Sequence, residues 1–155
     1  MAFSGRLTII ARGENTPAGL YSNNVRALVE HDAAYADAAA KTYYAAVSIA
    51  GSSTESLDLT TATDAFGAAL GASKVYTVLL ETPTTNGGNV GVSPSASNGW
   101  TGWLADASDK LKIGAGSRAL FDSAAGVAVS SSSRSLDFVN ATGSAQVINV
   151  LIICS

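Results

Sequence analysis

The stretch DKLKIGAGSRALFDSAAGVAVSSSSRSLDFVNATGSAQVINVLIIC, residues 109–154, consists of short apolar runs separated by turns of small residues. Leu111 and Ile113 alternate with lysines, and further on Leu136 and Phe138 alternate with polar residues. A period of two places one set of side chains in a core and the other in water, which is typical of half-buried strands. Residues 147–153 are apolar at almost every position and predict a strand in the centre of its sheet. Four or more strands in this stretch predict an antiparallel β-sandwich or barrel.

The same pattern extends upstream to residue 43. We expect further strands at residues 43–50, 55–59, 74–81 and 89–92. Asn86-Gly87, between the last two, is a strong signal for a hairpin turn, because both central positions of that turn need a positive φ. Phe66 is expected to be a buried anchor in its loop, and residues 123–126 are expected to be a turn. Eight or nine strands with some long loops predict a mainly β, jelly-roll-like antiparallel sandwich over residues 43–155.

Residues 1–42 differ in character and predict a separate N-terminal arm. Leu7–Ala11 is expected to form a short strand, and residues 12–19 have the composition of a loop. A short helix is predicted from Asn23 or Asn24, which would cap its N-terminus, with Val25 and Leu28 on its apolar face. Two interpretations of the arm remain open: it lies across its own sandwich, or it reaches onto a neighbouring subunit.

Composition favours a component of an assembly. Only 14% of the residues are charged while 47% are hydrophobic, and the net charge is −3. A surface so poor in charge is a solubility liability for a free monomer unless neighbours cover it. The basic residues are scattered, which argues against nucleic-acid binding. No apolar run approaches the roughly 18 residues of a membrane span, and the N-terminus lacks the layout of a signal peptide.

No residue pattern indicates an enzyme, a metal site or a cofactor. The single cysteine, Cys154, excludes an intrachain disulfide and is expected to be a small buried hydrophobe. His31 is the only histidine, and no GxSxG motif accompanies it. Residues 114–119 loosely match a dinucleotide fingerprint but precede a predicted strand, so a turn is the better interpretation. We expect the following aspartates to cap turns, since nothing marks two of them as a catalytic pair: Asp58, Asp64, Asp106, Asp109 and Asp122.

Trp100 and Trp103 lie in a Gly/Ser/Asn-rich loop as the sequence WTGW. Two large rings in such a loop must find cover or remain as a sticky surface. Three interpretations follow: a plug over one end of the sandwich, anchors of a protein interface, or a platform for stacking sugars.

Taken together, residues 56–81 (SLDLTTATDAFGAALGASKVYTVLLE), residues 89–121 and the C-terminal VINVLIIC resemble a family of small virion proteins of tailed bacteriophages. Its members are jelly-roll capsid decoration or cement proteins. The resemblance covers about two-thirds of the chain and implies a structural role, in which an oligomer clamps the capsid lattice from outside. Residues 1–42 depart from it, because they are longer than a minimal cement jelly roll requires.

The hypothesis is therefore a non-enzymatic virion protein on the outer surface of a phage capsid, without cofactor, nucleic-acid partner or membrane. It would bind the major capsid protein and its own copies as a dimer or trimer. The candidate contacts are Arg6, Arg12, Tyr21 and Arg26 of the arm, and Trp100 and Trp103 of the loop. The alternative is a carbohydrate-binding or adhesion module of a phage fibre or tail, and a hydrolase built on the sandwich is a third class.

Overall fold

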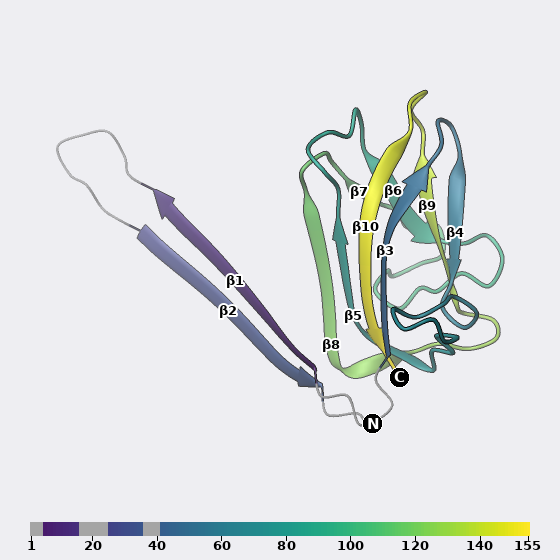
Figure 1. Cartoon of the computed structure of the whole chain (residues 1–155), viewed down its shortest axis with the longest axis horizontal. Coiled ribbons are helices and arrows are strands. Elements are labelled where there is room, and N and C mark those ends of the chain that lie inside the picture. Colours follow the sequence, from purple (N-terminus) through teal and green to yellow (C-terminus); the bar gives the residue numbers. More distant parts are fainter. Residues whose placement is uncertain (1–4, 16–24, 36–40) are drawn as a thin grey trace. The chain divides into compact units, whose positions relative to one another are not determined.

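The structure is a computed structural model, and it describes residues 5–15, 25–35 and 41–155. The chain divides into two compact units, Met1–Ala39 and Ala40–Ser155 (Figure 1). This division falls slightly before the boundary after residue 42 that the sequence suggests.

The first unit contains a two-stranded antiparallel ribbon. Strand β1 (Gly5–Asn15) pairs with β2 (Val25–Tyr35) over the whole length of both strands. The strand expected at Leu7–Ala11 is confirmed as part of β1, whereas the helix predicted after Asn24 is wrong, because that stretch forms β2. The physical reason is that Val25, Ala27 and Val29 also recur with a period of two, with polar residues at positions 26 and 30. β1 supplies a partner for the backbone hydrogen bonds of an extended chain.

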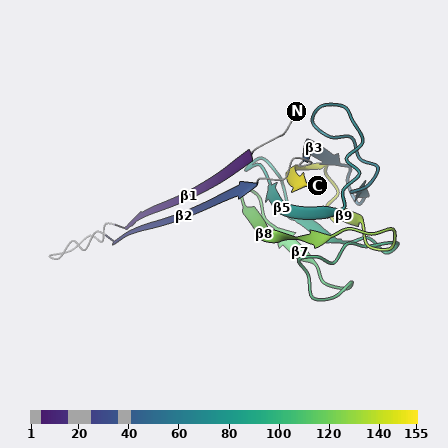
Figure 2. The same cartoon turned by 90° about the horizontal axis from the view of Figure 1, so that it is seen from below.

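The second unit is mainly β and consists of two four-stranded antiparallel sheets (Figures 1 and 2). The first sheet has the order β3 (Lys41–Ile49), β10 (Gln146–Cys154), β5 (Lys74–Glu81), β8 (Arg118–Ala128). The second has the order β4 (Thr54–Asp58), β9 (Ser135–Asn140), β6 (Val90–Pro94), β7 (Leu111–Ile113). No helix occurs in the residues that the structure describes. The prediction of an antiparallel, mainly β domain is confirmed, and the two sheets form a β-sandwich.

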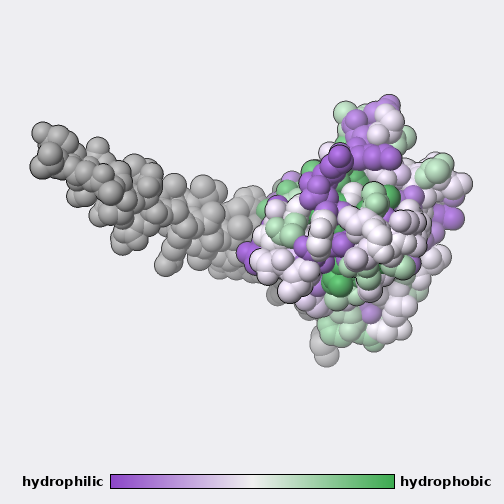
Figure 3. Space-filling model, turned by 90° about the horizontal axis from the view of Figure 1, so that it is seen from above, coloured by the Kyte–Doolittle hydropathy of each residue, from purple (hydrophilic) through white to green (hydrophobic). Residues whose placement is uncertain are grey.

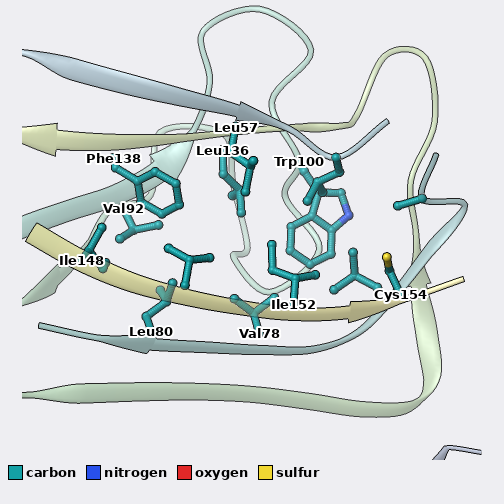
Figure 4. Packing of buried hydrophobic residues seen from close by; sticks show 14 of the residues in the cluster. Leu57, Val78, Leu80, Val92, Trp100, Leu136, Phe138, Ile148, Ile152 and Cys154 are labelled. Carbon is teal, nitrogen blue, oxygen red and sulfur yellow. The ribbon is translucent and has the colours of Figure 1, made fainter. Parts of the chain in front are cut away.

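The core lies between the two sheets. Ile148, Val150 and Ile152 of β10 alternate with less buried residues and have no exposed surface. They pack in one cluster with residues of the second sheet such as Leu136 and Phe138 of β9 (Figure 4). Because β10 has a hydrogen-bonded neighbour on each side, the prediction that residues 147–153 form a central strand is confirmed. Each such side chain stabilises the fold by about 1.5–3 kcal/mol when fully buried.

Asn86 differs from its expected role in a tight hairpin. Neither Asn86 nor Gly87 has a positive φ, and β5 and β6 lie in different sheets. The side-chain amide of Asn86 instead donates to the Val147 carbonyl at 2.8 Å and accepts from the Val147 amide at 3.0 Å. The asparagine therefore continues the backbone pairing of β10 and lets the chain cross between the sheets.

The turn expected at residues 123–126 is also absent, because β8 runs through it. The β5–β8 ladder shifts its register between Val75 and Thr77, and Gly126 has a φ of 69°. A Cβ atom on Gly126 would lie 2.8 Å from Cε1 of Tyr76. The glycine thus combines a left-handed backbone with room for the tyrosine ring, so the strand continues through a bulge.

Cys154 is buried at the end of β10, as expected. Burial raises the pKa of its thiol from 9.0 to about 11.

We expect the native protein to resist thiol reagents at about pH 8, since the thiolate is the reactive form, and the unfolded chain to react readily. The folded chain keeps a proton that the unfolded chain loses at lower pH, so the free energy of unfolding should fall as the pH rises from 9 to about 11. Equal labelling rates with and without denaturant would contradict this environment.

Candidate functional site

The two tryptophans of WTGW pack together over the core. Trp100 has no exposed surface, and its Nε1 donates to the Ala128 carbonyl at 3.0 Å. The Trp103 ring lies 5.8 Å from the Trp100 ring, and Phe121 contacts both rings edge-on at 6.4 and 6.0 Å. In Figure 4, Trp100 points between the strands towards Ile152. The rings thus have the arrangement expected of a plug.

This packing corrects the prediction that Trp100 is an interface contact, because a side chain without exposed surface offers none to a partner. The sugar-platform interpretation needs both rings exposed and loses its basis for the same reason. Trp103 is only partly buried, so its role as a contact remains a prediction.

Gly102 explains why the loop can close over Trp100. A Cβ atom at this position would lie 2.6 Å from Cε2 of Trp100 and 2.6 Å from Cγ1 of Val127. The glycine therefore lets the backbone rest directly against the indole ring.

Phenylalanine substitutions should separate the roles of the two tryptophans. We expect Trp100→Phe to lower the free energy of unfolding by about 1–3 kcal/mol, because it removes ring volume and the bond to Ala128. Trp103→Phe is the matched control: its buried Nε1 has no hydrogen-bond partner among the described residues. It should cost less than Trp100→Phe or even stabilise the fold. Urea unfolding followed by far-UV circular dichroism measures both, and a larger loss for Trp103→Phe would contradict this assignment.

Most of the aspartates predicted to cap turns do so, but Asp122 does not: it lies within β8, and its carboxylate accepts a hydrogen bond from the Thr77 hydroxyl at 2.7 Å. Asp64 accepts from the backbone amides of Phe66 and Ala68, and Asp109 accepts from those of Ala105 and Asp106. Within residues 41–155 and the two strands of the ribbon, no group of three His, Cys, Asp or Glu residues could hold a metal ion.

Asp58 shows how such a carboxylate is stabilised. Its Oδ1 accepts from the backbone amide and hydroxyl of Thr60 at 2.8 and 2.6 Å, and Arg134 Nε lies 2.9 Å from its Oδ2. Partial burial acts to raise the pKa of Asp58, but the Thr60 hydrogen bonds and the Arg134 charge outweigh it. The pKa is therefore lowered, so the carboxylate stays ionised as an anchor of the β4 end.

Phe66 is exposed rather than buried, which corrects the expected loop anchor. Its side chain is 82% exposed, while Leu59 and Leu70 on either side of the loop have no exposed surface. The loop is held by Asp64 and by the Ala65 amide, which donates to the Thr42 carbonyl at 2.8 Å. These polar bonds hold the turn without a buried aromatic ring.

An apolar row crosses the outer face of the first sheet. Tyr44 lies opposite Leu151, Leu151 lies opposite Leu79, and Leu79 lies opposite Leu120. The row therefore takes one residue from each of the four strands. Tyr44 is 64% exposed and Leu120 is 41% exposed, while Leu79 and Leu151 are half-buried. Figure 3 shows one face of this unit, on which residues of intermediate hydropathy are mixed with scattered hydrophilic and hydrophobic ones.

A polar row borders the apolar one. Glu81 lies opposite Arg118 and forms an ion pair with it at 2.6 Å. An apolar centre with a polar, solvent-accessible rim is the usual anatomy of a protein interface. The apolar row is thus flanked by a charged pair on this side.

The arm contacts predicted from sequence belong to the other compact unit. Arg6 and Arg12 lie in β1, and Arg26 lies in β2 opposite Glu14. Tyr21 lies outside the described residues. The arginines share one strand pair, but Trp100 and Trp103 do not belong to the same unit.

Sequence reasoning missed the apolar row, because its members come from strands that are far apart in the chain. The one available signal was the apolar character of residues 147–153 at outward as well as inward positions. No model of a known protein family matches the chain, and no curated protein matches it. None of the described residues forms a helix long and apolar enough to cross a membrane.

Proposed function

We propose that this chain is a structural decoration protein on the outer surface of a bacteriophage capsid, that it binds the major capsid protein and its own copies, and that its second unit is a jelly roll. The observation that carries this proposal is the apolar row on the outer face of the first sheet. A side chain such as Tyr44, 64% exposed beside three leucines, gains from being covered. The resemblance of residues 56–81, 89–121 and 147–154 to phage decoration proteins supplies the class of partner.

The strand pairing supports the jelly roll. The ladders β3·β10, β4·β9, β5·β8 and β6·β7 are nested within one another along the chain. Nested antiparallel pairs arise when one long antiparallel hairpin folds over on itself. The folded hairpin then forms two layers of four strands each. Eight strands in two such sheets are the arrangement of jelly rolls, which are common in viral capsid domains.

The polar chemistry of the second unit supports a structural role rather than catalysis. Asp58 and Asp64 bind nearby backbone amides, and Glu81 pairs with Arg118. These carboxylates stabilise turns and strand pairs, so their charges interact with groups of the same chain. The exposed apolar side chains remain the groups whose free energy improves on contact with another protein.

The size of the apolar row indicates binding at many weak contacts. Full burial of one large apolar side chain stabilises by about 1.5–3 kcal/mol, and the row is already partly covered. Association of two proteins costs roughly 4–15 kcal/mol in lost freedom, so a single contact of this kind is weak. A copy held to a capsid lattice by several contacts dissociates only when all of them break. Several weak contacts therefore bind one copy much more tightly than any single contact does.

Leu120→Lys tests the apolar row. We expect this variant to bind assembled particles at least about tenfold more weakly, because a charge replaces an apolar contact. Ser48→Lys is the matched control, since Ser48 is exposed on the edge strand β3 of the same sheet but lies outside the row. Occupancy is measured as copies per particle after co-sedimentation. Equal occupancy of Leu120→Lys and wild type would contradict binding through the row, and absence of wild-type protein from particles would contradict the proposed function.

Removal of residues 1–39 tests the contribution of the arm. Because these residues form a compact unit of their own, the remaining sandwich should fold, with the circular dichroism of an all-β protein. We expect it to occupy fewer sites on particles, since one set of contacts is lost. A truncation inside β1 would leave β2 unpaired, so the whole unit is removed. Unchanged occupancy would show that the arm does not contribute to particle binding.

A further inference from the structure

Strand β8 ends the first sheet, with β5 as its one neighbour among the strands that the structure describes (Figure 1). The Thr82 amide donates to the Ser117 carbonyl at 3.0 Å, and this is the next pair along the β5–β8 register. Hydrogen-bonded and non-hydrogen-bonded pairs alternate along an antiparallel ladder. Every second residue of β8 therefore turns its backbone N–H and C=O groups away from β5. These residues are Arg118, Leu120 and Asp122.

The other end of β8 is closed to a further strand. The Val129 amide donates to the Ser73 carbonyl at 2.8 Å, so the neighbouring carbonyl of Ala128 points away from the sheet. Trp100 Nε1 donates to this carbonyl at 3.0 Å, and the bulge in β8 interrupts the ladder before it. The regular edge of β8 thus consists of residues 118–122.

The charges of this edge are placed symmetrically about Leu120. Arg118 lies two residues before it, and Asp122 lies two residues after it. Charges on an edge strand usually keep copies of a protein apart. Here, a two-fold axis at Leu120 brings Arg118 opposite Asp122 of a second copy, and opposite charges at facing positions are favourable. The edge is therefore complementary to itself in this antiparallel register.

The other edge strands of the sandwich lack this symmetry. Strands β3 and β7 each carry one charge, on Lys41 and Lys112, and β4 carries the two acidic residues Glu55 and Asp58. If one of these strands pairs with its own copy, every charge that it brings has the same sign. Like charges at facing positions are destabilising, so charge favours β8 for self-pairing.

We propose that β8 pairs with β8 of a second copy of this chain, antiparallel and centred on Leu120, so that one sheet continues through both copies. The outward backbone groups of residues 118–122 then exchange N–H···O bonds across the two-fold axis. Facing residues share a face of the sheet, so Leu120 meets Leu120 of the second copy, and the apolar row continues from one copy into the other. This is the contact between copies that the proposed function calls for, and its place on a particle rests on that proposal.

Both charges keep their intrachain partners in this pair. Arg118 donates to Glu81 at 2.6 Å, and the Asp122 carboxylate accepts from the Thr77 hydroxyl at 2.7 Å. A guanidinium has several N–H donors and a carboxylate has several acceptor positions, so each group can take a further bond. The contact between copies thus adds to the bonds within each copy. Because the paired segment is short and each bond replaces one to water, association should be reversible.

A mixture of two variants tests the register. Arg118→Glu places acidic residues at both facing positions, whereas Asp122→Lys places basic residues there. Each change acts twice in a two-fold pair, so each variant alone should have a dissociation constant at least about tenfold above that of wild type. In an equimolar mixture, an acid again faces a base on both sides of the axis, so association should return close to that of wild type. Neither variant alters Leu120, which also belongs to the apolar row.

Sedimentation velocity of the full-length protein from about 1 µM to about 1 mM measures the association. Lys112→Glu is the matched control, because it makes the same charge reversal on the edge strand β7 of the second sheet, and it should leave association unchanged. Circular dichroism checks that each variant folds.

Amide hydrogen exchange of the wild type gives a second measurement that needs no variant. The Leu120 amide faces the second copy, so its exchange should slow as the protein concentration rises. The Ala119 amide is bonded to β5 within one copy and should exchange at a rate that does not depend on concentration.

Restored association in the mixture, together with slower exchange at Leu120, supports the pairing. A wild-type monomer over the whole concentration range overturns it, and so does a mixture that associates no more tightly than its components. An equal loss in Lys112→Glu also overturns it, because the effect would then be one of net charge. If a variant does not fold, the concentration dependence of exchange at Leu120 decides. All of these results leave the proposed function standing, because only absence of the wild-type protein from particles counts against that.

Discussion

The pairing of β10 with β3 on one side and β5 on the other is the constraint on which the sandwich depends. Ile148, Val150 and Ile152 of β10 form the middle of the core, and they can do so in one register only. A shift by one residue would move all three to the outer face and bring the outward residues into the core. Burial of these side chains therefore specifies which residues of three neighbouring strands face each other.

The same register produces the feature that most favours a role in assembly. Once Val150 and Ile152 point inward, Leu151 must point outward, and its ladder partners Tyr44 and Leu79 follow it. The apolar row is thus a consequence of the pairing that builds the core. In the second unit, the pairing that builds the core thus also aligns four apolar residues on the outer face of the first sheet.

The two largest differences from the sequence-based expectations arose where a local signal had two interpretations. Residues 25–35 contain alanines and apolar residues at helical spacing, yet Val25, Ala27 and Val29 also recur with a period of two, and the availability of β1 as a partner favours the strand. Asn86-Gly87 is a strong turn signal, but the Asn86 amide bonds to the backbone of Val147, which is distant in sequence. By contrast, the burial of Cys154 and the capping role of Asp64 were predictable, because apolar context and turn chemistry are local properties.

The sequence by itself determined that residues 43–155 form an antiparallel β domain, where most of its strands lie, and that residues 147–153 occupy the centre of a sheet. Periodicity carries this information, since each residue's preference for core or water is set by its own side chain and its immediate neighbours. Only the tertiary structure decided which strands are adjacent, and hence that Trp100 is buried under Phe121 while Tyr44, Leu79, Leu120 and Leu151 align into one row. Those relations join residues from distant parts of the chain, and no local pattern specifies the register between strands that are not consecutive.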